Sequence, residues 1–455
     1  MSDWRQYLEA QEERHLSELF DLLRIPSVSA LPEHRDDVRR GAAWLASRLR
    51  AAAVPVVEIL ETGGSPLVYG RCQVGAEQPT ALIYGHYDVQ PPDPLGLWTT
   101  PPFEPTLRED RYYARGSADD KSGVMIAITA VEALTSGGNA PPINLIFFFE
   151  GEEEIGSPNL AKFVHTERER LACDLVISAD GGMYGPDQPS LTISTKGLAG
   201  CAVTLRTANT DMHSGKYGAI VPNAVQALAR LAATFHTEDG RVAVDGFNDD
   251  VRPLSADDRA NIAVVPFDEV ALRAETGIEA LWGEPSFTPL ERAGSRPTLD
   301  FNGIWGGFQG EGAKTVTPSE AHLKITCRLV PNQDPERILD AIEQHVERYR
   351  PIGARVDVDR LPGSARPFEI PLGHVGLKTA RNVLRAEYGV EPLVVREGGT
   401  LPVAEIFQRE LGADMVFFAF SVPGSHAHAP NEWFRLEDFR RGRRAWAQLL
   451  IALAR

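Results

Sequence analysis

The stretch IYGHYD, residues 83–88, joins the end of an apolar run to a histidine and an aspartate that are two residues apart. In a β-strand, residues two apart point to the same face. Open α/β sheets hold their functional sites in the crevice at the carboxyl ends of the strands. The stretch therefore predicts a buried strand over residues 80–85 whose carboxyl end presents His86 and Asp88 to a site.

Other acidic residues and histidines follow apolar runs in the same way. These segments are RGSADDKSG with Asp119 and Asp120, INLIFFFEGEEE with Glu152, Glu153 and Glu154, LVISAD with Asp180, and MVFFAFSVPGSHAHAPNE with His426 and His428. Each segment alone has an ordinary interpretation, such as a helix N-cap for the aspartate pair or a solvated loop for the acidic triplet. Together they hold more charge at strand ends than a fold would bury without a use.

The side chains at these strand ends are the ligands that a divalent metal of borderline hardness prefers. Two imidazoles and three carboxylates are available at His86, Asp119, Glu154, Asp180 and His428. If Asp119 bridges two ions, each ion receives one histidine, one terminal carboxylate and the shared carboxylate. Three protein ligands leave a coordination position for water, as a catalytic site requires.

Two neighbouring acidic residues have separate expected roles. Glu153 stands beside a ligand and is free to act as a general base. Asp88 is expected to hold His86 in the right tautomer without binding metal itself.

The composition is that of an ordinary globular protein, with 43% hydrophobic and 24% charged residues. A chain of 455 residues exceeds the size of a single core, so two domains are expected. The net charge of −17, from 46 basic and 63 acidic residues, argues against nucleic acid or an anionic membrane as a partner.

The cysteines and the N-terminal residues indicate the cellular compartment in which the protein acts. The four cysteines, Cys72, Cys173, Cys201 and Cys327, form no CxxC motif, which predicts free thiols in a reducing compartment. The first twenty residues lack the apolar region of a signal peptide, and no apolar run reaches the roughly 18 residues of a membrane span. We therefore expect a cytoplasmic protein.

Helical segments and apolar runs alternate in the first part of the chain. Helices are predicted over 3–23, 35–53 and 123–135, and strands over 56–60, 67–72, 80–85, 143–149 and 175–179. Such alternation predicts helices packed on a largely parallel or mixed sheet. The same pattern returns from about residue 370, with helices over 374–388 and 435–454 and strands over 392–395 and 415–420.

The middle of the chain has a different pattern. Strand-like alternation at 191–207 is followed by a helix over 222–235, a polar stretch over 237–300, a strand over 322–330 and a helix over 334–350. This order predicts a smaller α+β domain, residues 193–369, inserted into an α/β domain made of residues 1–192 and 370–455.

Eight segments, in this order, resemble those of M20-type co-catalytic metallopeptidases of the carnosinase and cytosolic non-specific dipeptidase branch. The segments are GHYDVQPPDPLGLWTTPPFEP, YYARGSADDKSG, FFFEGEEEIGS, LVISAD, DMHSGKYG, CRLVPNQDP, REGGTLPV and AHAPNE. They run over nearly the whole chain, and such an ordered set is highly specific. The resemblance implies a two-domain α/β fold, in which a mixed-sheet, zinc-peptidase-like catalytic domain carries an inserted α+β lid or dimerisation domain.

The resemblance also implies a metal site with two divalent ions per subunit, Zn²⁺ by preference and Mn²⁺ or Co²⁺ as alternatives. His86 and Asp180 would bind one ion, Glu154 and His428 the other, and Asp119 both. The Asp119–Asp120 peptide is expected to be cis. Glu153 would be the general acid and base, and Asp88 would orient His86.

In the inserted domain, the resemblance implies contacts to substrate and to a second subunit. His213 would reach across a homodimer to the partner's site and contact the scissile carbonyl. Arg328, with help from Thr315, would bind the C-terminal carboxylate of the substrate. Thr400 and the Gly398–Gly399 backbone would line the same pocket.

Two positions depart from the pattern of the family or leave a choice. The carnosinase-like pattern VISD is one residue longer here, VISAD; Asp180 remains the expected ligand, ahead of Asp174 and Asp187. The spacing A-H-x-x-N-E favours His428 as a ligand, with His426 as the alternative.

The resemblance implies hydrolysis of dipeptides or short peptides with a free C-terminal carboxylate, by a metal-bridging water that Glu153 activates. The main alternative is a deacylase of the same superfamily acting on N-acyl amino acids, of the succinyl-diaminopimelate desuccinylase or acetylornithine deacetylase type. Peptidase branches resemble this chain in carrying Asp at the position of Asp180, where deacylases usually carry Glu. A non-catalytic binding protein on the same fold would lack a ligand or Glu153, and none is missing. A single-zinc protease with an HExxH motif is disfavoured because the motif is absent.

Overall fold

A computed structural model describes residues 3–454, which form two compact units. Unit 1 contains the chain up to Ile193, then Ile370–Val394 and the chain from Val403; unit 2 contains Ser194–Glu369 and Val395–Pro402. These bounds differ from the predicted ones by one residue at the first crossing. They also differ in Val395–Pro402, which belongs to unit 2 although the prediction placed it in the domain made of both ends of the chain.

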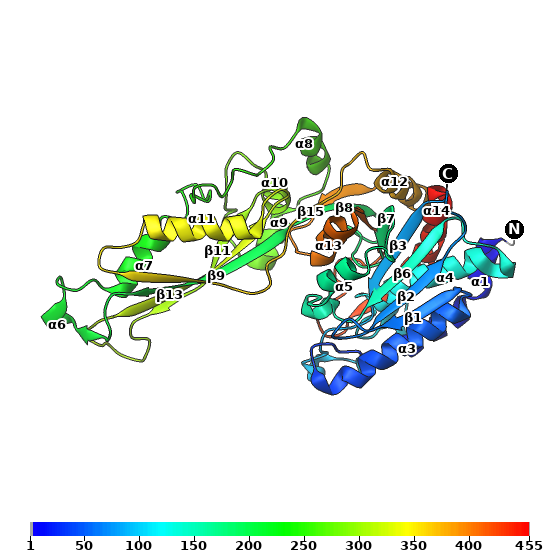
Figure 1. The fold of residues 1–455 in the computed structure, drawn as a ribbon, viewed down its shortest axis with the longest axis horizontal. Coiled ribbons are helices and arrows are strands. Elements are labelled where there is room, and N and C mark those ends of the chain that lie inside the picture. The colour runs from blue at the N-terminus through cyan, green and yellow to red at the C-terminus, as the bar shows by residue number, and fades with distance from the viewer. Residues whose placement is uncertain (1–2, 455) are drawn as a thin grey trace. The chain divides into compact units, whose positions relative to one another are not determined.

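Unit 1 is built on a six-stranded mixed sheet (Figure 1). In spatial order its strands are β1 (Val56–Leu60), β2 (Leu67–Cys72), β6 (Asn144–Glu150), β3 (Thr80–His86), β7 (Leu175–Ser178) and β17 (Met415–Phe417). β1, β2 and β6 pair antiparallel, whereas β6, β3, β7 and β17 run parallel. This mixed sheet among helices confirms the predicted α/β fold class.

Alternate side chains of β6 divide between the two faces of the sheet. Phe148 makes an edge-on ring contact with Phe407 of α13 (Pro402–Leu411). On the other face, Phe147 and Leu49 of α3 (Arg35–Ala51) both approach Gly70, where a Cβ would lie 3.0 Å from the Phe147 ring. Since both faces are covered, β6 is apolar and buried along its length.

The helix α4 (Lys121–Thr135) is almost entirely buried between the sheet and other helices. It contacts β3 and three helices, α1 (Trp4–Ala10), α2 (Glu12–Leu23) and α14 (Leu436–Leu453), and α12 (Val375–Tyr388) packs on α14. A helix without a broad polar face needs such surroundings. Its first turn comes so close to the end of β7 that a Cβ at Gly123 would lie 2.4 Å from the carbonyl oxygen of Ala179. This approach brings the turn before α4 to the carboxyl end of the sheet.

A small antiparallel sheet joins two distant loops of unit 1. Its strands, in spatial order, are β18 (Trp433–Arg435), β5 (Arg111–Tyr113) and β4 (Thr106–Arg108). Because Trp433 pairs with Tyr113, the chain entering β18 and the chain leaving β5 lie side by side. The first segment carries His428 and the second carries Asp119.

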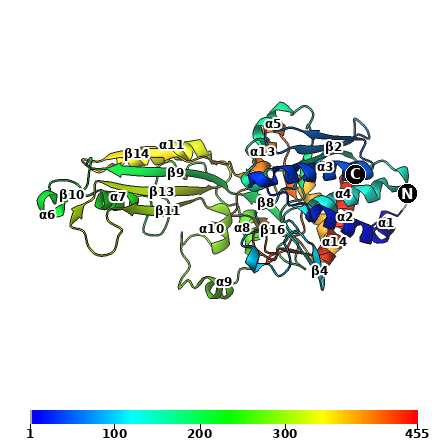
Figure 2. The same ribbon diagram turned by 90° about the horizontal axis from the view of Figure 1, so that it is seen from below.

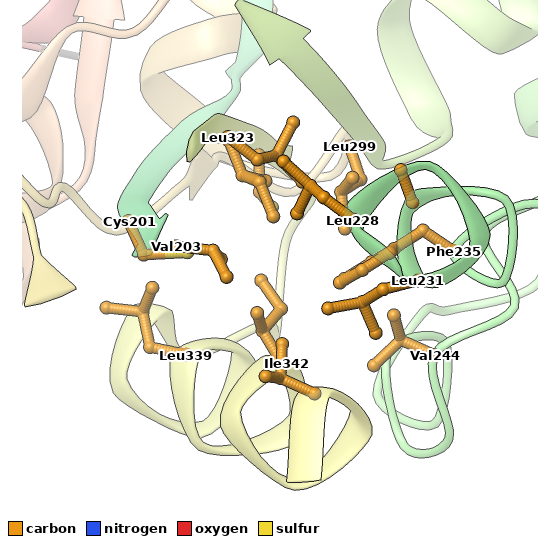
Figure 3. Packing of buried hydrophobic residues seen from close by; sticks show 14 of the residues in the cluster. Cys201, Val203, Leu228, Leu231, Phe235, Val244, Leu299, Leu323, Leu339 and Ile342 are labelled. Atoms are coloured by element: carbon orange, nitrogen blue, oxygen red, sulfur yellow. The ribbon is translucent and has the colours of Figure 1, made fainter. Parts of the chain in front are cut away.

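Unit 2 contains a four-stranded antiparallel sheet (Figure 2). Its strands, in spatial order, are β11 (Thr298–Gly306), β13 (Glu320–Leu329), β9 (Gly197–Arg206) and β14 (Arg355–Arg360). Buried and half-buried residues alternate along β9, because α7 (Ala224–Ala232) and α11 (Pro335–Arg348) pack on the buried face. Figure 3 shows this core, in which Val203 and Leu323 of the sheet lie near Leu228 and Leu231 of α7 and Ile342 of α11.

Several short elements complete the chain. In unit 1 these are α5 (Leu160–Thr166) and the 3₁₀ turns η1 (Pro32–His34), η2 (Leu95–Leu97), η3 (Ser136–Gly138) and η4 (Glu153–Ile155). Unit 2 adds β10 (Met212–His213), α6 (Ser214–Tyr217), α8 (Ala256–Ala263), α9 (Glu269–Thr276), α10 (Pro289–Ser295) and β12 (Val316–Thr317). A three-stranded sheet, β15 (Phe368–Glu369), β8 (Ser190–Thr195) and β16 (Leu393–Arg396), includes three of the points where the chain passes from one unit to the other.

The structure departs from the predicted elements in several places, including α13, β4 and β5, which were not predicted, and the following two stretches. The single helix expected over 3–23 is two helices, α1 and α2, separated at Gln11. The polar stretch 237–300, for which no element was predicted, contains α8, α9 and α10. These helices are too short to show an apolar period, and each begins at a side-chain N-cap, at Ser255, Asp268 and Thr288.

The four cysteines are free thiols, as predicted. Of the helices within residues 3–454, none is both long enough and apolar enough to cross a membrane.

Candidate metal centre

Three of the predicted ligands lie at the carboxyl ends of neighbouring parallel strands. His86 is the last residue of β3, Asp180 follows β7 by two residues, and Glu154 lies in η4, the turn after β6. Because β6, β3 and β7 are adjacent and parallel, these three ends meet at one edge of the sheet. Asp119 and His428 come from the two loops that β5 and β18 hold side by side.

The five ligands form two groups of three that share Asp119. Its Oδ1 lies 2.9 Å from Nε2 of His86, and Asp180 completes the first group. Its Oδ2 lies 2.9 Å from Nε2 of His428, which in turn lies 3.2 Å from Oε2 of Glu154. Within each group, the potential ligand atoms all lie within 4.8 Å of one another. One carboxylate therefore faces both groups, each oxygen toward a different histidine.

The structure also bears on two expectations at the Asp119 carboxylate. These are the choice between His428 and His426 as a ligand, and the cis peptide after Asp119. His428 contacts Asp119 and Glu154, whereas His426 is exposed and belongs to neither ligand group. The Asp119–Asp120 peptide is cis, as expected.

The charges of the two groups suit divalent cations. Hydrogen bonds to Asp119 and Glu154 raise the pKa of His428 to about 10. Burial and the Asp119 carboxylate raise the pKa of Asp180 to about 7. The neighbouring carboxylates contribute to both shifts, in addition to burial at Asp180, and a cation among them would lower both pKa values. One nitrogen and two carboxylate ligands per group also match what Zn²⁺, Mn²⁺ and Co²⁺ accept.

Glu153 lies beside the two groups and belongs to neither. Burial raises its pKa to about 9, helped by the carboxylates of Asp180 and Asp119 and opposed by His86. Divalent cations at the two groups would lower this pKa again. A titratable carboxylate held next to the ligands without being one of them is what a general base requires.

Asp88 is fully buried and contacts more than the histidine it was expected to orient. Nδ1 of His86 lies 3.1 Å from the main-chain oxygen of Asp88 and 3.5 Å from its Oδ1. The same carboxylate accepts hydrogen bonds from the main-chain N–H groups of Glu153 (3.2 Å) and Glu154 (3.1 Å). Asp88 therefore also fixes the η4 turn, and with it the candidate base and one ligand.

Gln90 contacts a ligand and was missed by the sequence analysis. Its Nε2 donates to Oε2 of Glu154 at 2.8 Å, and its main-chain N–H donates to Oε1 at 3.2 Å. Its position two residues beyond Asp88, in the segment DVQPP, was the available signal: it continues the alternation that starts at His86.

In unit 2, the structure brings together one pair of the predicted substrate-binding residues. Arg328, near the end of β13, donates from Nη1 to Oγ1 of Thr400 at 2.6 Å, although the two residues are 72 positions apart in sequence. The neighbouring Gly399 accepts a hydrogen bond from the main-chain N–H of Lys196. The loop over residues 397–400 is thus attached to the same end of the sheet as Arg328.

Thr315, which was expected to help Arg328 bind the substrate, lies elsewhere in unit 2 of the same chain. The carbonyl oxygen of Thr315 accepts a hydrogen bond from the N–H of Ser214, next to the exposed His213. Arg328 lies eight residues beyond Glu320, the first residue of β13, which is a length of strand of roughly 26 Å, and Thr315 comes before Glu320. Figures 1 and 2 both show α6, which follows His213, at one end of this sheet and α10 toward the other. Within one chain, Thr315 therefore groups with His213 and not with Arg328.

A mixed sheet whose strand ends hold two ligand groups with one shared carboxylate is the arrangement of a hydrolase with two metal ions. Residues 82–452 match Peptidase family M20/M25/M40, and the chain belongs to this family. The family confirms the resemblance found in the sequence.

Similar proteins cover almost the whole chain. The Cys-Gly metallodipeptidase of Schizosaccharomyces pombe is 28% identical over 396 residues, which are 86% of this chain and 83% of that protein. The human Beta-Ala-His dipeptidase is 26% identical, over 99% of this chain and 92% of that one. Among solved structures, an M20 family metallo-carboxypeptidase from Sulfolobus solfataricus is 31% identical with a TM-score of 0.82, covering 97% of this chain and 99% of that one.

Proposed function

We propose that this protein is a metal-dependent dipeptidase that hydrolyses the peptide bond of dipeptides or short peptides with a free C-terminal carboxylate. The proposal rests on the two ligand groups that share Asp119, with the unligated carboxylate of Glu153 beside them. Relatives named as a Cys-Gly metallodipeptidase and a Beta-Ala-His dipeptidase support the same reaction class. Neither name favours the deacylase alternative.

The proposed cofactor is a pair of divalent ions, with Zn²⁺ preferred and Mn²⁺ or Co²⁺ as alternatives. Their ligands are His86, Asp119 and Asp180 for one ion and Asp119, Glu154 and His428 for the other. When bound, such ions lower the pKa of a water molecule and polarise the scissile carbonyl group.

Glu153 is the proposed general base and acid. Its carboxylate accepts a proton from the attacking water and delivers it to the leaving amine as the peptide bond breaks. The η4 turn must keep that carboxylate in place during both transfers. Asp88 contributes to this by accepting the N–H groups of Glu153 and Glu154.

Arg328 and Thr400 are the proposed site for the C-terminal carboxylate of the substrate. A guanidinium group binds a carboxylate through two parallel hydrogen bonds, and the bond to Thr400 limits how the Arg328 side chain can turn. Backbone atoms at Gly399 lie in the same loop. A peptide that ends in an amide would lack the charge that this site recognises.

A homodimer through unit 2 is the proposed assembly, and β11 supports it. No strand within residues 3–454 pairs with the outer edge of β11, and Phe301, Ile304 and Trp305 on this strand are 37–56% exposed. The opposite edge, β14, is protected by charged residues. A long apolar edge strand is suited to pairing with the same strand of a second copy.

The dimer would explain why His213 and Thr315 lie together, away from Arg328. We propose that this end of unit 2 serves the active site of the partner subunit. There, the exposed imidazole of His213 would donate a hydrogen bond to the oxygen of the scissile carbonyl as negative charge develops on it. Its Nδ1 already accepts the N–H of Gly215, which leaves Nε2 to act as the donor.

We also propose that the protein acts in a reducing compartment such as the cytoplasm. Its four cysteines are free thiols, and three of them are buried.

Product analysis by mass spectrometry tests the proposed reaction. Protein loaded with Zn²⁺ or Mn²⁺ would be incubated with three pools: dipeptides, the same dipeptides as C-terminal amides, and N-acetyl and N-succinyl amino acids. A chelated sample and Glu153→Gln are the controls. Chelator-sensitive loss of the free dipeptides alone is expected, and loss of the acylated pool alone would replace the proposal by the deacylase.

A peptide-length series addresses a second possibility, because the relative from Sulfolobus solfataricus is named a metallo-carboxypeptidase. Peptides of two to six residues with the same C-terminal pair would be compared. We expect turnover to fall as length increases beyond the dipeptide. Equal turnover at every length would assign carboxypeptidase activity.

A further inference from the structure

Glu432 is a fully buried carboxylate that accepts four hydrogen bonds in unit 1. Its Oε2 accepts from Nη1 of Arg115 at 2.6 Å and from the N–H of Gly116 at 2.8 Å. Its Oε1 accepts from the N–H of Ala118 at 2.7 Å and from the N–H of Asp119 at 3.1 Å. Both oxygens are therefore occupied by donors of a single turn, the one that presents Asp119 to the two ligand groups.

Glu432 is itself anchored, so it can hold this turn in place. Its main-chain oxygen accepts the N–H of Ala114 at 3.1 Å, and the next residue, Trp433, pairs with Tyr113 in the small sheet. Buried N–H groups need acceptors, and in this turn one side chain supplies the acceptor for three of them.

Glu432 also stands four residues after His428, in the same loop. The two ends of this short segment therefore meet the same turn, His428 at the Asp119 carboxylate and Glu432 at the Asp119 main chain. His428 has few other constraints, since its side chain is 56% exposed. His86, in contrast, is fully buried at the end of β3. A shift of this loop relative to the Asp119 turn would move His428 directly, whereas His86 belongs to β3 and would not move with the loop.

We propose that Glu432 is a positioning residue that sets the separation of His428 and Asp119, and thereby the affinity of the second ligand group (Asp119, Glu154 and His428) for its ion. This inference rests on the proposed two-ion site. Glu432 belongs to neither ligand group; it acts through the turn that carries the shared ligand.

Glu432→Gln is the sharpest test, because a carboxamide has one acceptor oxygen where the carboxylate has two. The oxygen is expected to face Arg115 and Gly116, so the amide group would oppose the N–H groups of Ala118 and Asp119. Residues outside the ligand set typically change metal affinity by about 10- to 100-fold, and we expect such a loss for the weaker of two Zn²⁺ ions. Competition with a chromophoric chelator, with metal content by mass spectrometry, measures both affinities without an activity assay.

Glu132→Gln is the matched control. Glu132 is another nearly buried carboxylate of unit 1, paired with Arg48 and Arg14 among the helices and not with the Asp119 turn. Its replacement should leave both Zn²⁺ affinities unchanged. Mn²⁺-loaded samples add a second readout, since electron paramagnetic resonance detects the coupling of two ions that share a carboxylate, and Glu432→Gln should weaken that coupling.

The possible outcomes separate this inference from the proposed function. A folded Glu432→Gln protein that binds both ions as tightly as the wild type would overturn the role of Glu432, as would an equal loss in Glu132→Gln. If Glu432→Gln does not fold, Glu432→Asp retains both acceptor oxygens on a shorter side chain, and wild-type affinity in that variant would overturn the role equally. A wild-type protein that binds no divalent ion would overturn the proposed function as well.

Discussion

Complementation between two inactive variants tests whether each active site is built from two chains. His213→Ala removes the proposed partner contribution and Glu153→Gln removes the proposed base. Within one chain, the end of unit 2 that carries His213 and Thr315 lies roughly 26 Å along β13 from Arg328. That separation is several times the length of a dipeptide, so His213 and Arg328 of one chain cannot both contact the same substrate.

The expected recovery follows from the symmetry of a dimer. Random pairing of the two variants makes half of the dimers mixed, and each mixed dimer has one site with Glu153 from one chain and His213 from the other. About a quarter of the wild-type activity per chain should return in the random mixture, and about half in purified mixed dimers, because one of the two equivalent sites of each mixed dimer is intact. If His213 instead served the site of its own chain, every site would keep one defect and almost no activity would return.

The assay uses mixed dimers purified through two different affinity tags after co-expression, with hydrolysis of a free dipeptide as the readout. Co-expression of Glu153→Gln with Arg328→Met is the control: we propose that Arg328, unlike His213, serves the site of its own chain, so these two variants should not complement. Absence of recovery in purified mixed dimers of His213→Ala and Glu153→Gln would refute the cross-dimer role. A monomeric wild-type protein would refute it as well.

Three further predictions concern single variants. Glu153→Gln should bind two ions like the wild type but lower kcat by about 10²- to 10⁴-fold, the usual contribution of a positioned base; metal content and steady-state kinetics measure both. Arg328→Met should lower kcat/KM by about 10- to 100-fold for free dipeptides, as expected for a lost charged hydrogen bond, with little effect on dipeptide amides. Burial raises the pKa of Asp438 to about 7, so between about pH 4 and 7 the folded state binds more protons than the unfolded state and loses stability as pH rises. Asp438→Asn should therefore be more stable than the wild type at pH 8, by at most about 4 kcal/mol, and less so at pH 5, as urea denaturation would show.

Each of these three predictions for single variants has a result that would contradict it. Loss of an ion from Glu153→Gln would make Glu153 a ligand. Equal losses on free and amidated dipeptides in Arg328→Met would remove carboxylate recognition. A stability difference for Asp438→Asn that does not change between pH 5 and 8 would mean that the pKa of Asp438 is not raised. The prediction of a raised pKa rests on burial, because the Asp438 side chain is 1% exposed and neither of its oxygens accepts a hydrogen bond within the described chain.

The buried strands of unit 1 were predictable because their signal is local. The runs 80–85, 143–149 and 175–179 match β3, β6 and β7 within two residues. A strand covered on both faces must be apolar along its length, and such a run is visible in a single sequence. The helices α8, α9 and α10 gave no such signal, since only one or two turns and a capping side chain define each of them.

The sequence by itself predicted the five candidate ligands, with His426 left as an alternative to His428, because each ligand follows a recognisable strand or stands in a recognisable motif. It could not show how they are arranged. Only the tertiary structure decides that Asp119 divides its oxygens between His86 and His428, and that His426 is left outside.

The supporting contacts were also beyond the sequence. Asp88 fixes the η4 turn, and Glu432 holds the Asp119 turn across more than 300 positions of chain. Thr315 and Arg328 are only 13 positions apart, yet a full strand places them at opposite ends of a sheet. Hydrogen bonds between distant segments and the directions of strands depend on which segments come into contact in the folded chain. A local stretch of sequence does not show which distant segments it will contact. The candidate ligands are therefore visible in the sequence, whereas the choice between His428 and His426 and the spacing and orientation of the ligands are properties of the fold.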